Sequence, residues 1–78
     1  MTAIVYRQLP DRPKRQYIHR LIDNRLPLWR TDPHVALRME RNDAKRLAET
    51  LRQRSTGYGG KQAVREPVGE YGIEDVTA

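Results

Sequence analysis

The chain contains no cysteine and no phenylalanine, and it has no long apolar segment. Without cysteine it forms neither a disulfide nor a thiolate metal site. Its longest aliphatic run is Ala-Ile-Val at residues 3–5, far short of the roughly 18 apolar residues that a membrane span needs. No apolar core of a signal peptide is found near the N-terminus. We therefore expect a cytoplasmic protein with no membrane partner.

Apolar residues of all kinds are scarce, at 37% of 78 residues. A chain of this length forms one domain, and a core this small contributes only about 3–5 kcal/mol of net stability. Twelve of the 16 Val, Ile and Leu residues precede residue 52. The composition thus predicts a compact domain at residues 1–54 and a Gly-rich basic linker or loop at 55–65. Residues 66–78 would form an acidic tail, either docked on the domain or added to its sheet as an edge strand.

Basic residues are absent from the end of the chain. Residues 1–65 carry 15 basic and six acidic side chains, whereas residues 66–78 carry four acidic and no basic ones. Twelve of the 15 are arginines, whose planar fork suits carboxylates, phosphates and aromatic faces. The excess indicates an anionic or planar partner, although a GC-rich genome would also give a high ratio of arginine to lysine.

Local patterns predict a small α+β fold with an antiparallel sheet. β-branched and aromatic residues predict strands at residues 3–8, 26–31 and 34–40, with Pro27 placing the second of them at an edge. Apolar residues at i, i+3, i+4 and i+7 predict a helix at about residues 42–54 that covers the sheet. Asn42 or Asp43 would cap the start of this helix.

Residues 12–24 fit two structures. Tyr17, Ile18, Leu21 and Ile22 fall on one face of a helix that Asp11 would cap, and this second helix is the preferred interpretation. The competing interpretation is a β-hairpin that returns from the first strand.

The candidate binding residues are basic or aromatic, and none is catalytic. The helix face and the following loop supply cations, Tyr58 is placed to stack on a partner, and Trp29 serves either as a core residue or as an exposed anchor. A charged helix face is also what an ordinary solvated helix presents. The predicted partner-binding set is Arg41, Lys45, Arg46, Arg52, Arg54, Tyr58, Lys61 and Trp29.

Motifs for catalysis, metals or cofactors are missing. The segment 57–61 (Gly-Tyr-Gly-Gly-Lys) lacks the first glycine and the Ser/Thr of a phosphate-binding loop and follows a helix instead of a strand. His19 and His34 are too few for a metal site in a chain without cysteine. The only serine, Ser55, lies at the predicted linker. We therefore expect no enzyme activity, no metal and no cofactor.

Two functions are consistent with these features. The first is a non-enzymatic inhibitor or regulator that binds a protein or ribonucleoprotein complex with an acidic surface. It would act sterically. We expect such a protein to be encoded by a phage and to act on host machinery that handles nucleic acid, as an anti-CRISPR protein acts on a CRISPR-type defence complex. The alternative is a small DNA- or RNA-binding accessory protein that contacts phosphates through the arginine-rich helix face. Either would be a monomer or a homodimer.

Overall fold

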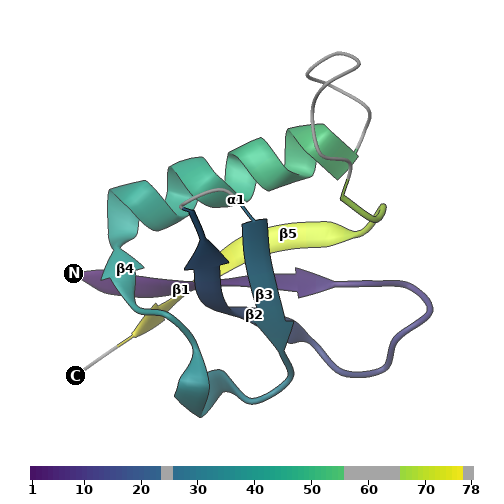
Figure 1. The fold of residues 1–78 in the computed structure, drawn as a ribbon, viewed down its shortest axis with the longest axis horizontal. Helices are drawn as coiled ribbons and strands as arrows, with labels where there is room; N and C mark the ends of the chain where they lie inside the picture. Colours follow the sequence, from purple (N-terminus) through teal and green to yellow (C-terminus); the bar gives the residue numbers. More distant parts are fainter. Residues whose placement is uncertain (24–25, 56–65, 77–78) are drawn as a thin grey trace.

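A computed structural model describes residues 1–23, 26–55 and 66–76, which form a five-stranded antiparallel sheet with one helix packed on it (Figure 1). This arrangement confirms the predicted α+β class. The elements in chain order are β1 (Thr2–Gln8), β2 (Gln16–Ile22), β3 (Leu26–Arg30), the 3-10 turn η1 (Pro33–Val35), β4 (Met39–Glu40), α1 (Arg41–Ser55) and β5 (Glu70–Val76).

Strand β1 is the centre of the sheet. Strand β5 pairs with it over all seven residues, from Thr2 opposite Val76 to Gln8 opposite Glu70. The other edge of β1 is shared, because β4 pairs at Thr2 and Ala3 while β2 pairs further along the strand. β2 then leaves β1, and the backbone oxygen of Ile18 accepts a hydrogen bond from the Leu37 N–H at 2.8 Å. The β2–β3 hairpin therefore crosses the direction in which β1, β5 and α1 run (Figure 1).

The core lies between α1 and the face of β1 and β5 turned toward it. The spacing of Ala44, Ala48 and Leu51 places them on one side of the helix, and all three are buried. They meet the alternate residues Ala3 and Val5 of β1 and Tyr71 of β5. The packed core thus extends past the boundary at residue 54 that the composition suggested.

The helix predicted at 12–24 is wrong, since residues 16–22 form β2. A bulge between Ile18 and Arg20 explains why the sequence resembles a helix. In a regular strand Ile18 and Leu21 would lie on opposite faces, but the extra residue shifts the alternation, and both pack on the core. The exposed Ile22 lies on the other side.

Two further local predictions need correction. Residues 34–40 do not form one strand, because Asp32 accepts a hydrogen bond from the His34 N–H and starts η1, which leaves only Met39 and Glu40 as β4. The helix cap is also different. The Glu40 carboxylate, and neither Asn42 nor Asp43, accepts the first free N–H groups of α1, at 2.8 and 3.3 Å.

The opposite burial of two isoleucines gives a direct test of strand β2. We predict that Ile18→Val lowers the free energy of unfolding by about 0.5–1.5 kcal/mol, because Ile18 is fully buried. Ile22→Val is the matched control on the outer side of the same strand and should have almost no effect. Urea unfolding followed by circular dichroism measures both. Equal losses would mean that both side chains share one buried face, as in the helix.

Candidate binding surfaces

The predicted basic face of α1 is only partly available to a partner. Arg41 donates to Asp75 at 2.9 Å, and Arg52 pairs with Glu49 one turn earlier. Lys45 and Arg46 are exposed and make no ion pair with the described residues. Arg54 is half-buried. Tyr58 and Lys61 lie outside the described residues.

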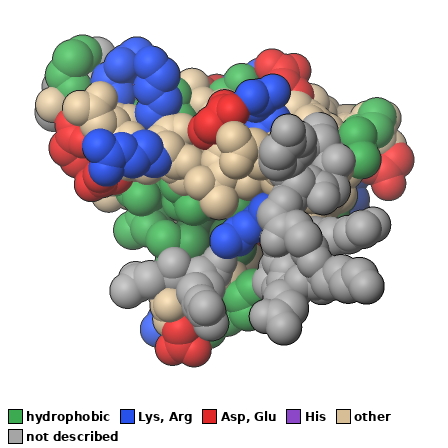
Figure 2. Space-filling view, turned by 90° about the horizontal axis from the view of Figure 1, so that it is seen from above, with side chains coloured by type: hydrophobic (Ala, Val, Ile, Leu, Met, Phe, Trp, Pro, Cys, Tyr) green, Lys and Arg blue, Asp and Glu red, His purple; other side chains and the backbone are tan. Residues whose placement is uncertain are grey.

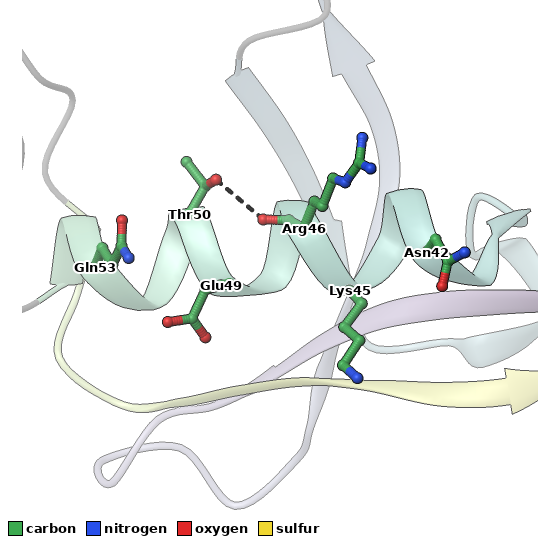
Figure 3. Close-up of a pocket in the computed structure, with 6 residues that line it drawn as sticks. All are labelled: Asn42, Lys45, Arg46, Glu49, Thr50 and Gln53. Atoms are coloured by element: carbon green, nitrogen blue, oxygen red, sulfur yellow. Dashed lines mark hydrogen bonds between the residues drawn. The ribbon is translucent and has the colours of Figure 1, made fainter.

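Acidic and polar side chains interrupt the cations of this face. Seen from above the helix, basic and acidic groups are interspersed with uncharged surface (Figure 2). A shallow hollow is lined by Asn42, Lys45, Arg46, Glu49, Thr50 and Gln53. Arg46 and Lys45 point to different sides of the helix (Figure 3). The Thr50 hydroxyl donates a hydrogen bond to the backbone oxygen of Arg46 at 3.0 Å. The helix therefore presents a mixed surface and no continuous basic stripe.

Trp29 belongs to a cluster around a buried arginine, which the sequence did not reveal. The Arg7 guanidinium lies 4.2 Å from the centre of the Trp29 ring, and Trp29 meets Tyr71 edge-on at 6.3 Å between centroids. Arg7 also donates to Gln16 at 2.7 Å and lies 3.5 Å from a carboxylate oxygen of Glu66. The side chains of Arg7 and Glu66 are only 12% and 8% exposed. Below, this group is called the Arg7 cluster.

Burial dominates the electrostatics of the Arg7 cluster. Loss of solvent raises the pKa of the Glu66 carboxyl, although the charges of Arg7 and Arg54 act in the opposite direction. Burial likewise raises the pKa of the Tyr71 hydroxyl, which donates to the backbone oxygen of Pro67 at 2.5 Å. Arg7, Glu66 and Tyr71 each have a polar partner within the chain, and these contacts attach the segment before β5 to β1 and β2.

A second group of aromatic and charged residues lies on the sheet face turned away from α1. Tyr6 and Tyr17 are directly opposite each other on β1 and β2. Arg15 covers the Tyr6 ring at 4.0 Å and pairs with Glu74 at 2.6 Å. The Tyr6 ring rests on Gly72, where an added Cβ would lie 2.7 Å from the hydroxyl oxygen. Acidic and basic groups balance here too, which does not suit a phosphate backbone.

The outer face of the β2–β3 hairpin is different, because its aliphatic side chains are exposed and its arginines have no partner among the described residues. Ile22 lies opposite Leu26, and Leu28 lies opposite Arg20. The three aliphatic side chains are 41–43% exposed, and Arg20 and Arg30 flank them. Neither arginine makes an ion pair or side-chain hydrogen bond with a described residue. We call these five residues the hairpin surface.

Sequence reasoning missed the hairpin surface because it assigned residues 12–24 to a helix. The signal was nevertheless present, since Leu26, Leu28 and Arg30 alternate with Pro27 and Trp29, as on the two faces of a strand. Once Trp29 faces the core, Leu26 and Leu28 must face outward.

Other classes of site find no support among the described residues. Residues 1–23, 26–55 and 66–76 contain no group of three or more His, Asp or Glu side chains that could hold a metal ion. In the same part of the chain, no helix has the length and apolar character needed to cross a bilayer. No family model matches this chain, and comparison with curated proteins and with solved structures finds no significant match.

The raised pKa of Glu66 gives a testable pH dependence. An acid that holds its proton more tightly in the folded state stabilises the fold at low pH, and this contribution is lost as the pH rises through the folded pKa. In the wild-type protein, we predict that the free energy of unfolding decreases as the pH rises above the ordinary carboxyl pKa of 4.5. The Glu66→Gln variant, which has no carboxyl group at this position, should lack this decrease. Parallel urea titrations of both proteins between pH 4 and 8 measure the difference. The prediction would be contradicted if the wild-type protein became more stable relative to Glu66→Gln as the pH rises.

Proposed function

We propose that this protein is a non-enzymatic regulator or inhibitor that binds another protein and acts sterically, by covering a surface which that protein needs. The observation that carries the proposal is the hairpin surface. Ile22, Leu26 and Leu28 face outward on the β2–β3 hairpin, and beside them lie two arginines that make no ion pair with a described residue. The buried core of a protein–protein interface is more apolar than the rest of the surface, and arginine is enriched at such interfaces.

The distribution of charge favours a protein partner over nucleic acid. A protein that tracks a phosphate backbone needs several unpaired cations in a row. On α1, only Lys45 and Arg46 are both exposed and free of ion pairs with the described residues. The acidic Glu49 follows them along the helix, so the row of unpaired cations is not continued. The hairpin surface combines three exposed aliphatic side chains with two arginines. That combination suits an acidic protein surface with apolar groups of its own. A nucleic-acid-handling complex as the target stays a prediction from composition alone.

Affinity capture with matched variants tests the proposal. The tagged protein is incubated with a lysate of the cells that encode it, and retained proteins are identified by mass spectrometry. The Leu28→Ser/Arg30→Glu variant should lose the partner, whereas Lys45→Glu/Arg46→Glu on α1 should retain it. The unfolding free energies of both variants are measured first, so that a loss of folding is not mistaken for a loss of binding. Retention by the hairpin variant, with loss by the helix variant, would contradict the proposal.

Titration with labelled DNA and RNA distinguishes the alternative function. Fluorescence anisotropy at about 50 and 200 mM salt should detect only weak binding of every probe. A protein that contacts six to ten phosphates loses roughly 10³-fold or more in affinity over this range. Tight binding with that salt dependence would replace the proposal with the nucleic-acid function.

A further inference from the structure

Two strands at the outside of the sheet, β3 and β5, are opposite in charge. β5 carries Glu70, Glu74 and Asp75 and no basic residue, whereas β3 ends in Arg30 and carries no acidic residue. Among the described strands, β5 pairs only with β1, and β3 pairs only with β2. Each strand therefore has one edge whose backbone groups are not bonded to a described strand. Such an edge is a template for pairing with another extended chain.

The two edges differ in how their charges are used. On β5, Glu74 and Asp75 already form ion pairs with Arg15 and Arg41, and Glu70 accepts a hydrogen bond from the Tyr6 hydroxyl at 3.3 Å. On the β3 side, Arg20 and Arg30 form no ion pair with any residue in the described ranges 1–23, 26–55 and 66–76. The carboxylates of β5 thus already have partners, while the β3 edge combines arginines that make no ion pair with a described residue with exposed leucines.

We propose that the edge of β3 binds an extended acidic segment of the partner protein as an additional strand. This inference rests on the proposed function and specifies the chemistry that the hairpin surface recognises. Backbone groups along the free edge would pair with the incoming strand. Its apolar side chains would extend the row of Leu26 and Leu28, and its carboxylates would meet Arg20 and Arg30. Pro27 has no N–H to donate, which restricts the pairing to a short segment.

The fold itself contains a precedent for this recognition. β5 is an extended acidic segment in which Tyr71 and Ile73 alternate with Glu70, Gly72 and Glu74 before Asp75 ends the alternation, and it pairs with β1 over seven residues. Its carboxylates are held by arginines from outside the strand, namely Arg15 and Arg41. A second copy of the chain is a poor occupant of the β3 edge, because its β5 carboxylates are already paired and its hairpin surface has the same positive charge. Charge complementarity therefore selects an acidic strand from another protein.

The probe for this proposal is a synthetic heptapeptide, acetyl-Glu-Thr-Val-Thr-Val-Thr-Glu-amide. In an extended conformation it places two valines between two glutamates on one face. The valines can therefore lie beside Leu26 and Leu28, and one of the glutamates lies near Arg30 whichever way the peptide runs. Titration into the ¹⁵N-labelled full chain should shift the amide resonances of β3 and leave those of β5 unchanged. A peptide with lysines in place of both glutamates should bind roughly tenfold more weakly. The original peptide should lose affinity to a similar extent when it is titrated into the Arg30→Glu protein.

Backbone methylation separates strand addition from simple contact with the surface. One peptide is N-methylated at residues 3 and 5 and another at residues 2, 4 and 6, so that the first lacks the two central N–H donors of one edge and the second lacks the three donors of the other edge. Strand addition predicts that one of the two loses binding and the other keeps it. Equal behaviour of the two, or no shift of β3 resonances by the unmodified peptide at millimolar concentration, would overturn the proposal. Concentration-dependent self-association through β3, detected by ultracentrifugation, would overturn it in favour of a second copy.

The experiments distinguish a failure of the proposed function from a failure of strand addition. If the hairpin variant still captures the partner, the proposed function is wrong. If the hairpin variant loses the partner while the methylated peptides behave alike, the hairpin surface binds a protein by another mode than strand addition.

Discussion

The structure depends most on the burial of one guanidinium group. Arg7 extends from the central strand toward the core side of the sheet, where few water molecules can reach it, since its side chain is only 12% exposed. A buried charge is very costly unless it is paired and hydrogen-bonded. Gln16, Trp29 and Glu66 supply an acceptor, an aromatic face and a carboxylate. These residues come from β2, β3 and the segment before β5, so the requirements of one side chain join four parts of the chain.

This constraint also explains the charge distribution along the sequence. The acidic end of the chain is complementary to arginines of the body, because Glu66, Glu74 and Asp75 each meet one of them. Exposed ion pairs contribute little stability individually, but here they accompany a strand that pairs over its full length. Glu49, Glu74 and Asp75 are already paired with arginines. In the described part of the chain, Arg20 and Arg30 of the hairpin are in contrast unpaired arginines that lie beside exposed aliphatic side chains. The surface left for a partner is thus a consequence of how the fold satisfies its other charges.

Sequence reasoning reached the fold class and the 42–54 helix because both depend on local periodicity. Ala44, Ala48 and Leu51 recur at the helical spacing, and no tertiary contact is needed to recognise them. It failed at β2 because a bulge places Ile18 and Leu21 on one face, so that a strand imitates the spacing of a helix. Bulges are set by pairing with a neighbouring strand, which a single sequence does not display.

The candidate site was less accessible than the fold for a similar reason. Sequence alone identified the arginines, but whether an arginine is free depends on residues far along the chain. Arg41 is neutralised by Asp75, and Arg7 is buried against Glu66. The prediction that the helix face binds a partner counted Arg41 and Arg52 as available, although both are paired. The alternation of the hairpin residues is visible in the sequence, but which arginines stay unpaired depends on these long-range pairs.

A double-mutant cycle on Arg7 and Glu66 tests the central claim most directly. Arg7→Met removes the charge with little change in length and leaves a buried carboxylate unpaired, which costs about 3–5 kcal/mol in comparable buried pairs. Combined with Glu66→Gln, the same substitution should cost less, with a coupling of about 0.5–3 kcal/mol in the unfolding free energy at pH 7. Hydrogen exchange of the β5 amides should accelerate in Arg7→Met and recover in the double variant. Additive losses, with β5 exchange unchanged, would show that the buried pair does not hold the C-terminal strand.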